Sequence, residues 1–137
     1  MKLEEIMSTR VVTIEMDDTL DVIQILFNKI HFHHLVVMSE NNKVMGVISD
    51  RDLLEALSPY LKTSFEQERD LHTLNRKAHQ IMSRELVMAS PEDTVEFAGS
   101  LMLEKDISCL PIISEKLSLV GIVTWRDIIR HLCSASP

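Results

Sequence analysis

Four unbroken runs of apolar residues stand out along the chain, at 35–38, 44–48, 110–113 and 119–123. Strands that are buried on both faces read as continuous apolar runs, so we predict such strands at 35–38 and 110–113, and a returning strand after each of them, at 44–48 and 119–123. A shorter extended piece precedes each pair, at Val11–Ile14 and at Leu86–Ala89. The first piece consists entirely of β-branched residues, which favours a further strand.

Polar segments that contain Asp and Thr precede two amphipathic helices. The segments 16–19 and 90–94 can cap free backbone N–H groups, and they therefore predict helix starts. The faces that follow are Leu20, Ile23, Phe27 and Ile30 in the first helix, and Val95, Ala98, Met102 and Lys105 in the second, which we expect to fray at Lys105. Helical turns at 3–7 and 78–82 open each half, and short helices at 51–57 and 126–132 close it.

The two halves are copies of one unit. A shift of 75 residues brings Ile6-Met7-Ser8 onto Ile81-Met82-Ser83, and thirteen of the fifty pairs from Ile6–Ile81 to Glu55–Arg130 are identical. Two copies favour a closed pair with a pseudo-twofold axis, and a cleft between such halves suits a small ligand. We predict an α+β fold with two β-α-β-β-α repeats, whose small mixed sheets pack on helices. Its expected parts are repeat 1 at 1–58, a helical linker at 59–75 that packs through Leu71 and Leu74, and repeat 2 at 76–137.

Composition narrows the class of protein. The formal net charge of −7 argues against a general nucleic-acid binder, which needs a basic face. No apolar run approaches the roughly 18 residues of a membrane span, and the N-terminus lacks the apolar core of a signal peptide, so we expect a cytoplasmic protein without membrane contact. Cys109 lies in an apolar run and is expected to be a small buried side chain.

The sharpest local motif is Gly46-Val47-Ile48-Ser49-Asp50-Arg51-Asp52, which returns as Gly121-Ile122-Val123-Thr124-Trp125-Arg126-Asp127. A glycine inside each strand indicates a bulge or a close approach of another backbone. Ser-x-x-Asp and Thr-x-x-Asp are also capping boxes, in which hydroxyl and carboxylate tie off the start of a helix. The motif therefore permits two interpretations, a local cap and a ligand contact, which do not exclude each other.

The repeated motif, the Ile-Met-Ser openings and the apolar strand pairs resemble the CBS domain, and two in tandem resemble a Bateman module. The chain is similar to small stand-alone bacterial CBS proteins, including those of the acetoin-utilisation type. This resemblance implies a regulatory module, not an enzyme, that binds AMP, ADP, ATP or S-adenosylmethionine, forms a homodimer and acts through an effector protein. A structural or protein-interaction module that no longer binds nucleotide is the alternative.

The resemblance also implies which residues meet the ligand. Asp52 and Asp127 would hold ribose hydroxyls, Ser49 and Thr124 would bond a phosphate, and Arg51 and Arg126 could neutralise it. Thr13-Ile14 and Met88-Ala89 would meet the base, partly by main chain. The second repeat has Pro111, as the family often does, where the first has Val36. Met88 lacks the hydroxyl of Thr13, so we expect two unequal sites, one of which could be empty.

Three histidines before a strand are the remaining candidate chemistry. We expect His33 or His34 to line the ligand site. Adjacent residues of a strand point to opposite faces, so these two histidines are poorly placed to bind one metal ion. We therefore expect no metal site and no cofactor beyond the ligand. His31 completes this group.

Trp125 either fills an interface or covers the ligand. No Ser-His-Asp or Cys-His arrangement and no Gly-rich phosphate loop is present, so nothing recommends a catalyst.

Overall fold

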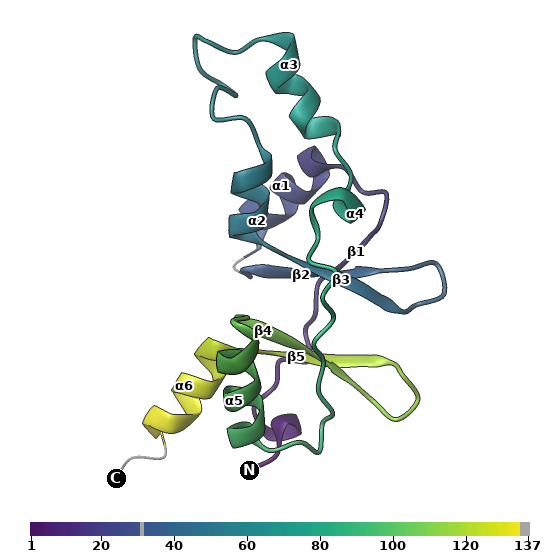
Figure 1. The fold of residues 1–137 in the computed structure, drawn as a ribbon, viewed down its shortest axis with the longest axis vertical. Helices are drawn as coiled ribbons and strands as arrows, with labels where there is room; N and C mark the ends of the chain where they lie inside the picture. The colour runs from purple at the N-terminus through teal and green to yellow at the C-terminus, as the bar shows by residue number, and fades with distance from the viewer. Residues whose placement is uncertain (31, 135–137) are drawn as a thin grey trace. The chain divides into compact units, whose positions relative to one another are not determined.

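The computed structural model describes residues 1–30 and 32–134, and its elements are short strands and helices (Figure 1). Their bounds are η1 Leu3–Glu5, β1 Thr13–Glu15, α1 Leu20–Lys29, β2 His34–Met38, β3 Val44–Ser49, α2 Asp50–Ala56, α3 Glu68–Leu71, η2 His72–Asn75, α4 Ala78–Ile81, α5 Val95–Lys105, β4 Cys109–Ile113, β5 Leu119–Thr124 and α6 Trp125–Ser134. The α+β class and the two strand pairs are confirmed, with β2 and β4 buried over most of their length and β3 alternating between buried and half-buried residues. None of the helices in the described ranges has the length and apolar character of a membrane span.

The chain forms two compact units whose composition differs from that of the sequence repeats. One unit comprises Val12–Leu86, and the other comprises Met1–Val11 together with the chain from Val87 onward. We call them the 12–86 unit and the 87–134 unit. The opening turn of each repeat thus packs in the unit that the other repeat builds. The predicted boundaries 1–58 and 76–137 describe the sequence repeats, and as domain boundaries they stay a prediction.

In the 12–86 unit a mixed sheet carries two helices on one face. The strand order is β1-β2-β3, with β1 parallel to β2 and β2 antiparallel to β3. Helices α1 and α2 lie on the same side of this sheet (Figure 1). Their shared core includes Ile23, Leu53 and, from the sheet, Ile14, Leu35 and Ile48. The face predicted for the first helix is confirmed, because Leu20 and Ile23 are fully buried in it.

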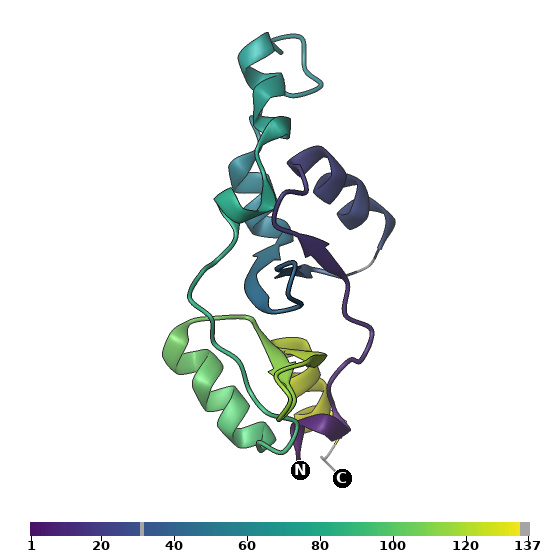
Figure 2. The same ribbon diagram turned by 90° about the vertical axis from the view of Figure 1, so that its right-hand side faces the viewer.

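The 87–134 unit repeats this arrangement with one strand fewer. Strands β4 and β5 are antiparallel, and Ala89 forms a single parallel bridge with Ile112. That bridge has the register of the Ile14–Val37 pair, 75 residues earlier. The extended piece predicted at 86–89 is therefore reduced to this bridge. Figure 2 shows the N-terminal segment beside α5 and α6, and Leu3 of that segment is fully buried in the core of this unit.

The exchanged openings explain the glycines inside β3 and β5. Ser83 donates its N–H to the Val47 carbonyl at 3.0 Å, and Ser8 donates its N–H to the Ile122 carbonyl at 2.9 Å. A β-carbon on Gly46 would stand 2.6 Å from the carbonyl oxygen of Ser83, so a second backbone does pass close by. The register also shifts between Val37 and Met38, beside Gly46, so both readings of the glycine are confirmed.

The helix predicted for the linker begins only at Glu68. Pro59 has no N–H to donate, and the preceding Ser58 donates its hydroxyl to Asp70 Oδ1 at 2.6 Å. Asp70 is buried and also accepts the N–H of Gln67 through Oδ2 at 2.8 Å, which caps the start of α3. The stretch between these contacts is a series of turns, with Lys62 at a φ of 61°. Leu71 is exposed, so the apolar stripe predicted for the linker, Leu71 with Leu74, is narrower than expected.

Candidate functional site

The mixed sheet of the 12–86 unit gathers most of the first repeat's predicted site residues on one face. His34 pairs with Ser49, and Thr13 pairs with Val36, which pairs with Val47. Directly paired residues share a face and neighbours along a strand alternate, so Thr13, His34 and Ser49 lie on one face. The core residues Ile14, Leu35 and Ile48 occupy the opposite face. We call the group Thr13, His34, Ser49, Arg51 and Asp52 the first half-site.

At the end of β3 the chain turns into α2 through a complete capping box. Asp52 donates its N–H to Ser49 Oγ at 3.0 Å, and Ser49 donates its N–H to Asp52 Oδ2 at 2.8 Å. The local cap considered for this motif is therefore confirmed. A carboxylate can accept about four hydrogen bonds, so the cap leaves Asp52 with further acceptor capacity for a diol. Arg51, next to it, is exposed.

A histidine and an aspartate join the entry of β2 to the start of α2. His33 Nδ1 lies 2.7 Å from Asp50 Oδ2, and Asp50 donates its N–H to the carbonyl oxygen of His33 at 3.0 Å. The hydrogen bond from His33 lowers the pKa of Asp50 from its ordinary value. Burial lowers the pKa of His34 from its ordinary value, against the attraction of Asp50 and Asp52, so His34 favours the neutral form. Sequence reasoning missed Asp50, although its mismatch with Trp125 at the matching position could have drawn attention to it.

The 87–134 unit carries the matching residues Met88, Thr124, Arg126 and Asp127, and we call these four together with Pro111 the second half-site. Cys109 pairs with Thr124, and Pro111 pairs with Ile122, in the register of the first half-site. Asp127 Oδ2 accepts the N–H of Thr124 at 2.8 Å and its hydroxyl at 3.2 Å. Met88 is exposed, whereas Pro111 is fully buried. The Thr124 hydroxyl thus donates to the Asp127 carboxylate, whereas the Ser49 hydroxyl accepts the N–H of Asp52.

Two of the residues assigned to the base present no side chain to a ligand. Ile14 and Ala89 are buried in the cores of their units. The main chain of Ala89 is also occupied, because its N–H bonds the Pro111 carbonyl at 3.1 Å and its carbonyl accepts from Ile113 at 2.9 Å. In a strand, adjacent backbone groups point to opposite edges, so the free main-chain groups at these positions belong to Thr13 and Met88.

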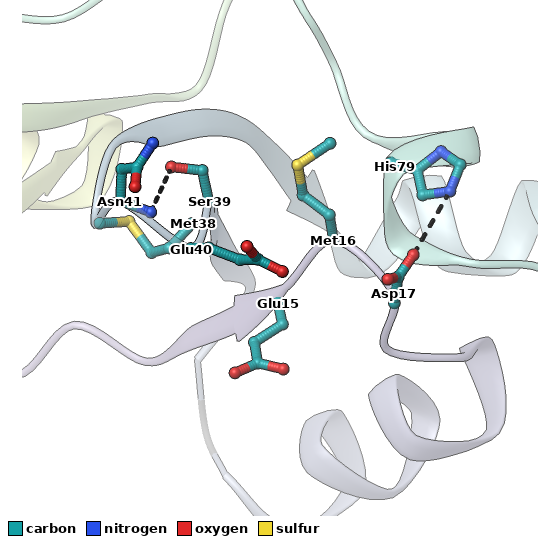
Figure 3. Close-up of a pocket in the computed structure, with 8 residues that line it drawn as sticks. All are labelled: Glu15, Met16, Asp17, Met38, Ser39, Glu40, Asn41 and His79. Atoms are coloured by element: carbon teal, nitrogen blue, oxygen red, sulfur yellow. Dashed lines mark hydrogen bonds and ion pairs between the residues drawn. The ribbon is translucent and has the colours of Figure 1, made fainter.

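A hollow of about 550 Å³ lies at the other end of β1 and β2. Figure 3 shows its lining, which consists of Glu15, Met16, Asp17, Met38, Ser39, Glu40, Asn41 and His79. His79 Nε2 lies 3.8 Å from Asp17 Oδ1. A second hollow of about 690 Å³ lies between the end of α2 and the linker, and its lining includes Leu57 and Leu74. Neither hollow includes a residue of the two half-sites.

The described residues do not assemble a metal centre. No group of three His, Cys, Asp or Glu side chains with the geometry to hold a metal ion occurs among residues 1–30 and 32–134. His33 and His34 have different surroundings, because His33 bonds Asp50 and His34 lies in β2. His31, the third histidine of the group, lies outside the described residues.

Comparison with known sequences identifies the repeated unit. Residues 3–59 and 78–134 each match the family model of the CBS domain. An uncharacterized protein of Methanocaldococcus jannaschii, MJ1426, is 30% identical, over 96% of this chain and 91% of that protein. A homoserine O-acetyltransferase of Methanobrevibacter ruminantium is also 30% identical over 97% of this chain, but the match spans only 24% of that enzyme.

Comparison with solved structures confirms the fold of a tandem pair. The CBS domain pair of protein MJ0100, in complex with 5′-methylthioadenosine and S-adenosyl-L-methionine, has a TM-score of 0.82 at 22% identity, over 99% of this chain and 98% of that one. The acetoin utilization protein AcuB of Vibrio cholerae has a TM-score of 0.77 at 22% identity, over 98% and 91%. CBSX2 in complex with AMP has a TM-score of 0.77 at 22% identity, over 97% and 96%.

Proposed function

The chain belongs to the CBS domain family as a tandem pair, and we propose that it is a regulatory module that binds an adenosyl ligand and has no catalytic site of its own. The ligand class comprises AMP, ADP, ATP and S-adenosylmethionine. Proteins of the same fold were solved with S-adenosyl-L-methionine and with AMP, which supports this class. The acetyltransferase activity of one relative is not carried over, because the match covers only a quarter of that enzyme.

The observation that carries the proposal is the repeated placement of a hydroxyl and a carboxylate at the end of a strand. Ser49 with Asp52, and Thr124 with Asp127, occupy the same register in their units. In this proposal each aspartate accepts from the ribose diol, while the hydroxyl residue bonds the 5′ part of the ligand. A carboxylate suits a vicinal diol because it offers several acceptor positions and no competing donor.

The remaining residues of each half-site take supporting roles. Thr13 offers a hydroxyl and free main-chain groups to the base, and Met88 offers main-chain groups and a thioether. Arg51 and Arg126 are exposed and can form two parallel hydrogen bonds with an anionic group. His34 lies on the same sheet face as Thr13 and Ser49, so it can bond or stack on the ligand. His33 bonds Asp50 and would therefore influence the ligand only through that residue.

A structural or protein-interaction module is the second candidate, and the capping boxes favour it. The contacts of Ser49 with Asp52 already satisfy both groups in part without a ligand. In that case the Ser/Thr-x-x-Asp ends would serve the helices alone. This candidate predicts that removal of either aspartate lowers stability and changes no binding constant.

We further propose that the protein acts as a homodimer and passes its signal to an effector protein. Large apolar side chains remain exposed on helices of both units, among them Ile25 of α1, Leu54 of α2, Phe97 of α5 and Ile129 of α6. Exposed apolar side chains on helices suit a dimer interface, and obligate interfaces bury about 2,000 Å² or more.

Calorimetric titration of the full chain with AMP, ATP and S-adenosylmethionine tests the proposed function. We expect at least one of the three to bind with a negative heat-capacity change, because the adenine ring leaves water. ADP follows as a fourth titrant if ATP and AMP differ. An absence of binding for all of them would favour the structural module.

A further inference from the structure

The two half-sites differ in charge at matching positions. Residues 50–55 carry a formal charge of −2 and residues 125–130 a formal charge of +1. The charged members are Asp50, Arg51, Asp52 and Glu55 in the first stretch, and Arg126, Asp127 and Arg130 in the second. Two substitutions produce the contrast, because Trp125 stands where Asp50 does and Arg130 stands where Glu55 does.

The backbone places Asp50 and Trp125 equivalently. Asp50 donates its N–H to the His33 carbonyl at 3.0 Å, and Trp125 donates its N–H to the Ser108 carbonyl at 3.1 Å. The donor and the acceptor of the second bond each lie 75 residues after those of the first. The carboxylate of Asp50 and the indole of Trp125 therefore leave the chain at the same point beside the Ser/Thr-x-x-Asp end. The Asp50 side chain is about half exposed, at 47%.

His33 holds the Asp50 carboxylate in place. Its Nδ1 lies 2.7 Å from Asp50 Oδ2, whereas the matching residues in the second repeat, Ser108 and Trp125, carry no charge. A side chain fixed by a hydrogen bond and a backbone contact presents its charge at a defined position. An anion that bonded Ser49 would meet two carboxylates, those of Asp50 and Asp52, against the single guanidinium group of Arg51, so the net charge of these three residues is negative.

At the second half-site a cation lies beside the ribose aspartate. Arg130 Nη1 is 3.6 Å from Asp127 Oδ1, and the guanidinium of Arg126 lies 6.0 Å from the centre of the Trp125 ring. Asp127 has 15% of its side chain exposed and Arg130 has 76%, so the guanidinium group of Arg130 stays accessible to a ligand. Two guanidinium groups therefore flank Asp127 in sequence, and arginine is well suited to bind phosphate.

We propose that the two half-sites sort adenosyl ligands by the charge of the 5′ substituent. The first half-site takes a ligand whose 5′ group is uncharged or cationic, such as a thioether or a sulfonium, and Asp50 is the residue that excludes phosphate. The second half-site takes a ligand with a 5′-phosphate, which Arg126 and Arg130 favour. This inference rests on the proposed function, because it specifies which member of the adenosyl class each half-site accepts.

The test compares two probes that differ only at the 5′ position, AMP and 5′-methylthioadenosine, in calorimetric titrations at pH 8 and 150 mM salt. Asp127→Ala isolates the first half-site and Asp52→Ala isolates the second. With Asp127→Ala we expect 5′-methylthioadenosine to bind more tightly than AMP, and with Asp52→Ala we expect the reverse. Adding Asp50→Asn to Asp127→Ala should strengthen AMP about three- to tenfold, as expected for the loss of one like charge near a partly exposed anion. It should leave 5′-methylthioadenosine unchanged.

Two further variants separate a local effect from a change in total charge. Glu104→Gln removes one negative charge from an exposed position of α5, outside both half-sites, and should change neither probe. Arg130→Glu, added to Asp52→Ala, should weaken AMP and leave 5′-methylthioadenosine unchanged. If an alanine variant fails to fold, Asp50→Asn in the otherwise unchanged chain serves instead, because AMP should then gain affinity at one of its two sites.

The outcomes distinguish this inference from the proposed function. If the probes bind but their ratio of affinities is equal at both half-sites, or if Asp50→Asn and Glu104→Gln change AMP equally, the sorting by charge is wrong and adenosyl binding stands. If neither probe nor S-adenosylmethionine binds the unchanged chain, the proposed function is wrong and the inference is overturned with it.

Discussion

The carbonyl oxygen of Ser83 covers the α-carbon of Gly46, so that a β-carbon there would stand 2.6 Å from it. The obstructing atom belongs to a backbone, which cannot rotate aside. Gly46→Ala should therefore push the exchanged segment away from β3 and reduce the free energy of unfolding by about 1–3 kcal/mol, as overpacking does. Urea denaturation followed by circular dichroism measures this change.

Gly99→Ala is the matched control. Gly99 lies in α5, and the nearest atom to a β-carbon there is Ile128 Cγ2 at 4.0 Å, which is ordinary contact. Alanine in a helix is favoured over glycine by roughly 0.5–1 kcal/mol, so this variant should be more stable than the parent. Equal losses at positions 46 and 99 would contradict the close approach of Ser83.

Sequence periodicity predicted the elements better than their association. The buried strands and helix faces followed from apolar spacing, because burial on a sheet or a helix leaves a local trace in the chain. The exchange of the opening turns between the two units left no such trace in the sequence, because Met7-Ser8 and Met82-Ser83 are identical and each fits either unit equally well. The charge contrast between Asp50 and Trp125 was visible in the sequence. Its meaning required the shared backbone contact that places both residues at one point.

Asp52→Ala and Asp127→Ala should each weaken a distinct ligand site. A hydrogen bond to a charged group contributes roughly 1.5–3 kcal/mol, so the dissociation constant should rise about ten- to a hundredfold. Calorimetry with the ligand that binds the parent measures the change. Asp93→Ala is the control for the lost cap, because Asp93 Oδ2 accepts the N–H of Ser90 at 2.8 Å in the same kind of contact before α5. It should lose stability and keep its affinity, and unchanged binding in both site variants would remove the ribose assignment.

Thr13→Val should weaken one site and spare the other. The substitution keeps the shape of the side chain and removes the hydroxyl, and Met88 at the matching position has none. A neutral hydrogen bond contributes roughly 0.5–1.5 kcal/mol, which sets the expected loss in binding free energy. Met88→Thr is the complementary variant and should strengthen the other site. Two sites of equal affinity, both unmoved by Thr13→Val, would contradict the predicted asymmetry.

Ile129→Glu should convert the proposed homodimer to a monomer. Ile129 is 46% exposed on α6, and a buried carboxylate without a partner is costly at an apolar interface. Light scattering at micromolar concentration would give the mass of each species. Leu117→Glu is the control, since Leu117 is 71% exposed in the turn between β4 and β5 and lies on no helix. A monomeric parent would contradict the dimer directly.

Stability should fall as the pH falls below 6.5, because of His34. Burial lowers the pKa of His34 in the folded state below the ordinary 6.5, whereas the unfolded chain takes up a proton at about that pH. The unfolded state then binds more protons, so the free energy of unfolding decreases with falling pH, by at most about 1.4 kcal/mol per pH unit for one group. His34→Gln should flatten this slope between pH 7.5 and pH 5 in urea titrations. Asp50 does not interfere in this range, because its lowered pKa confines its contribution to pH values below about 3.8. A slope that is equally steep in the parent and in His34→Gln would show that another group causes the loss.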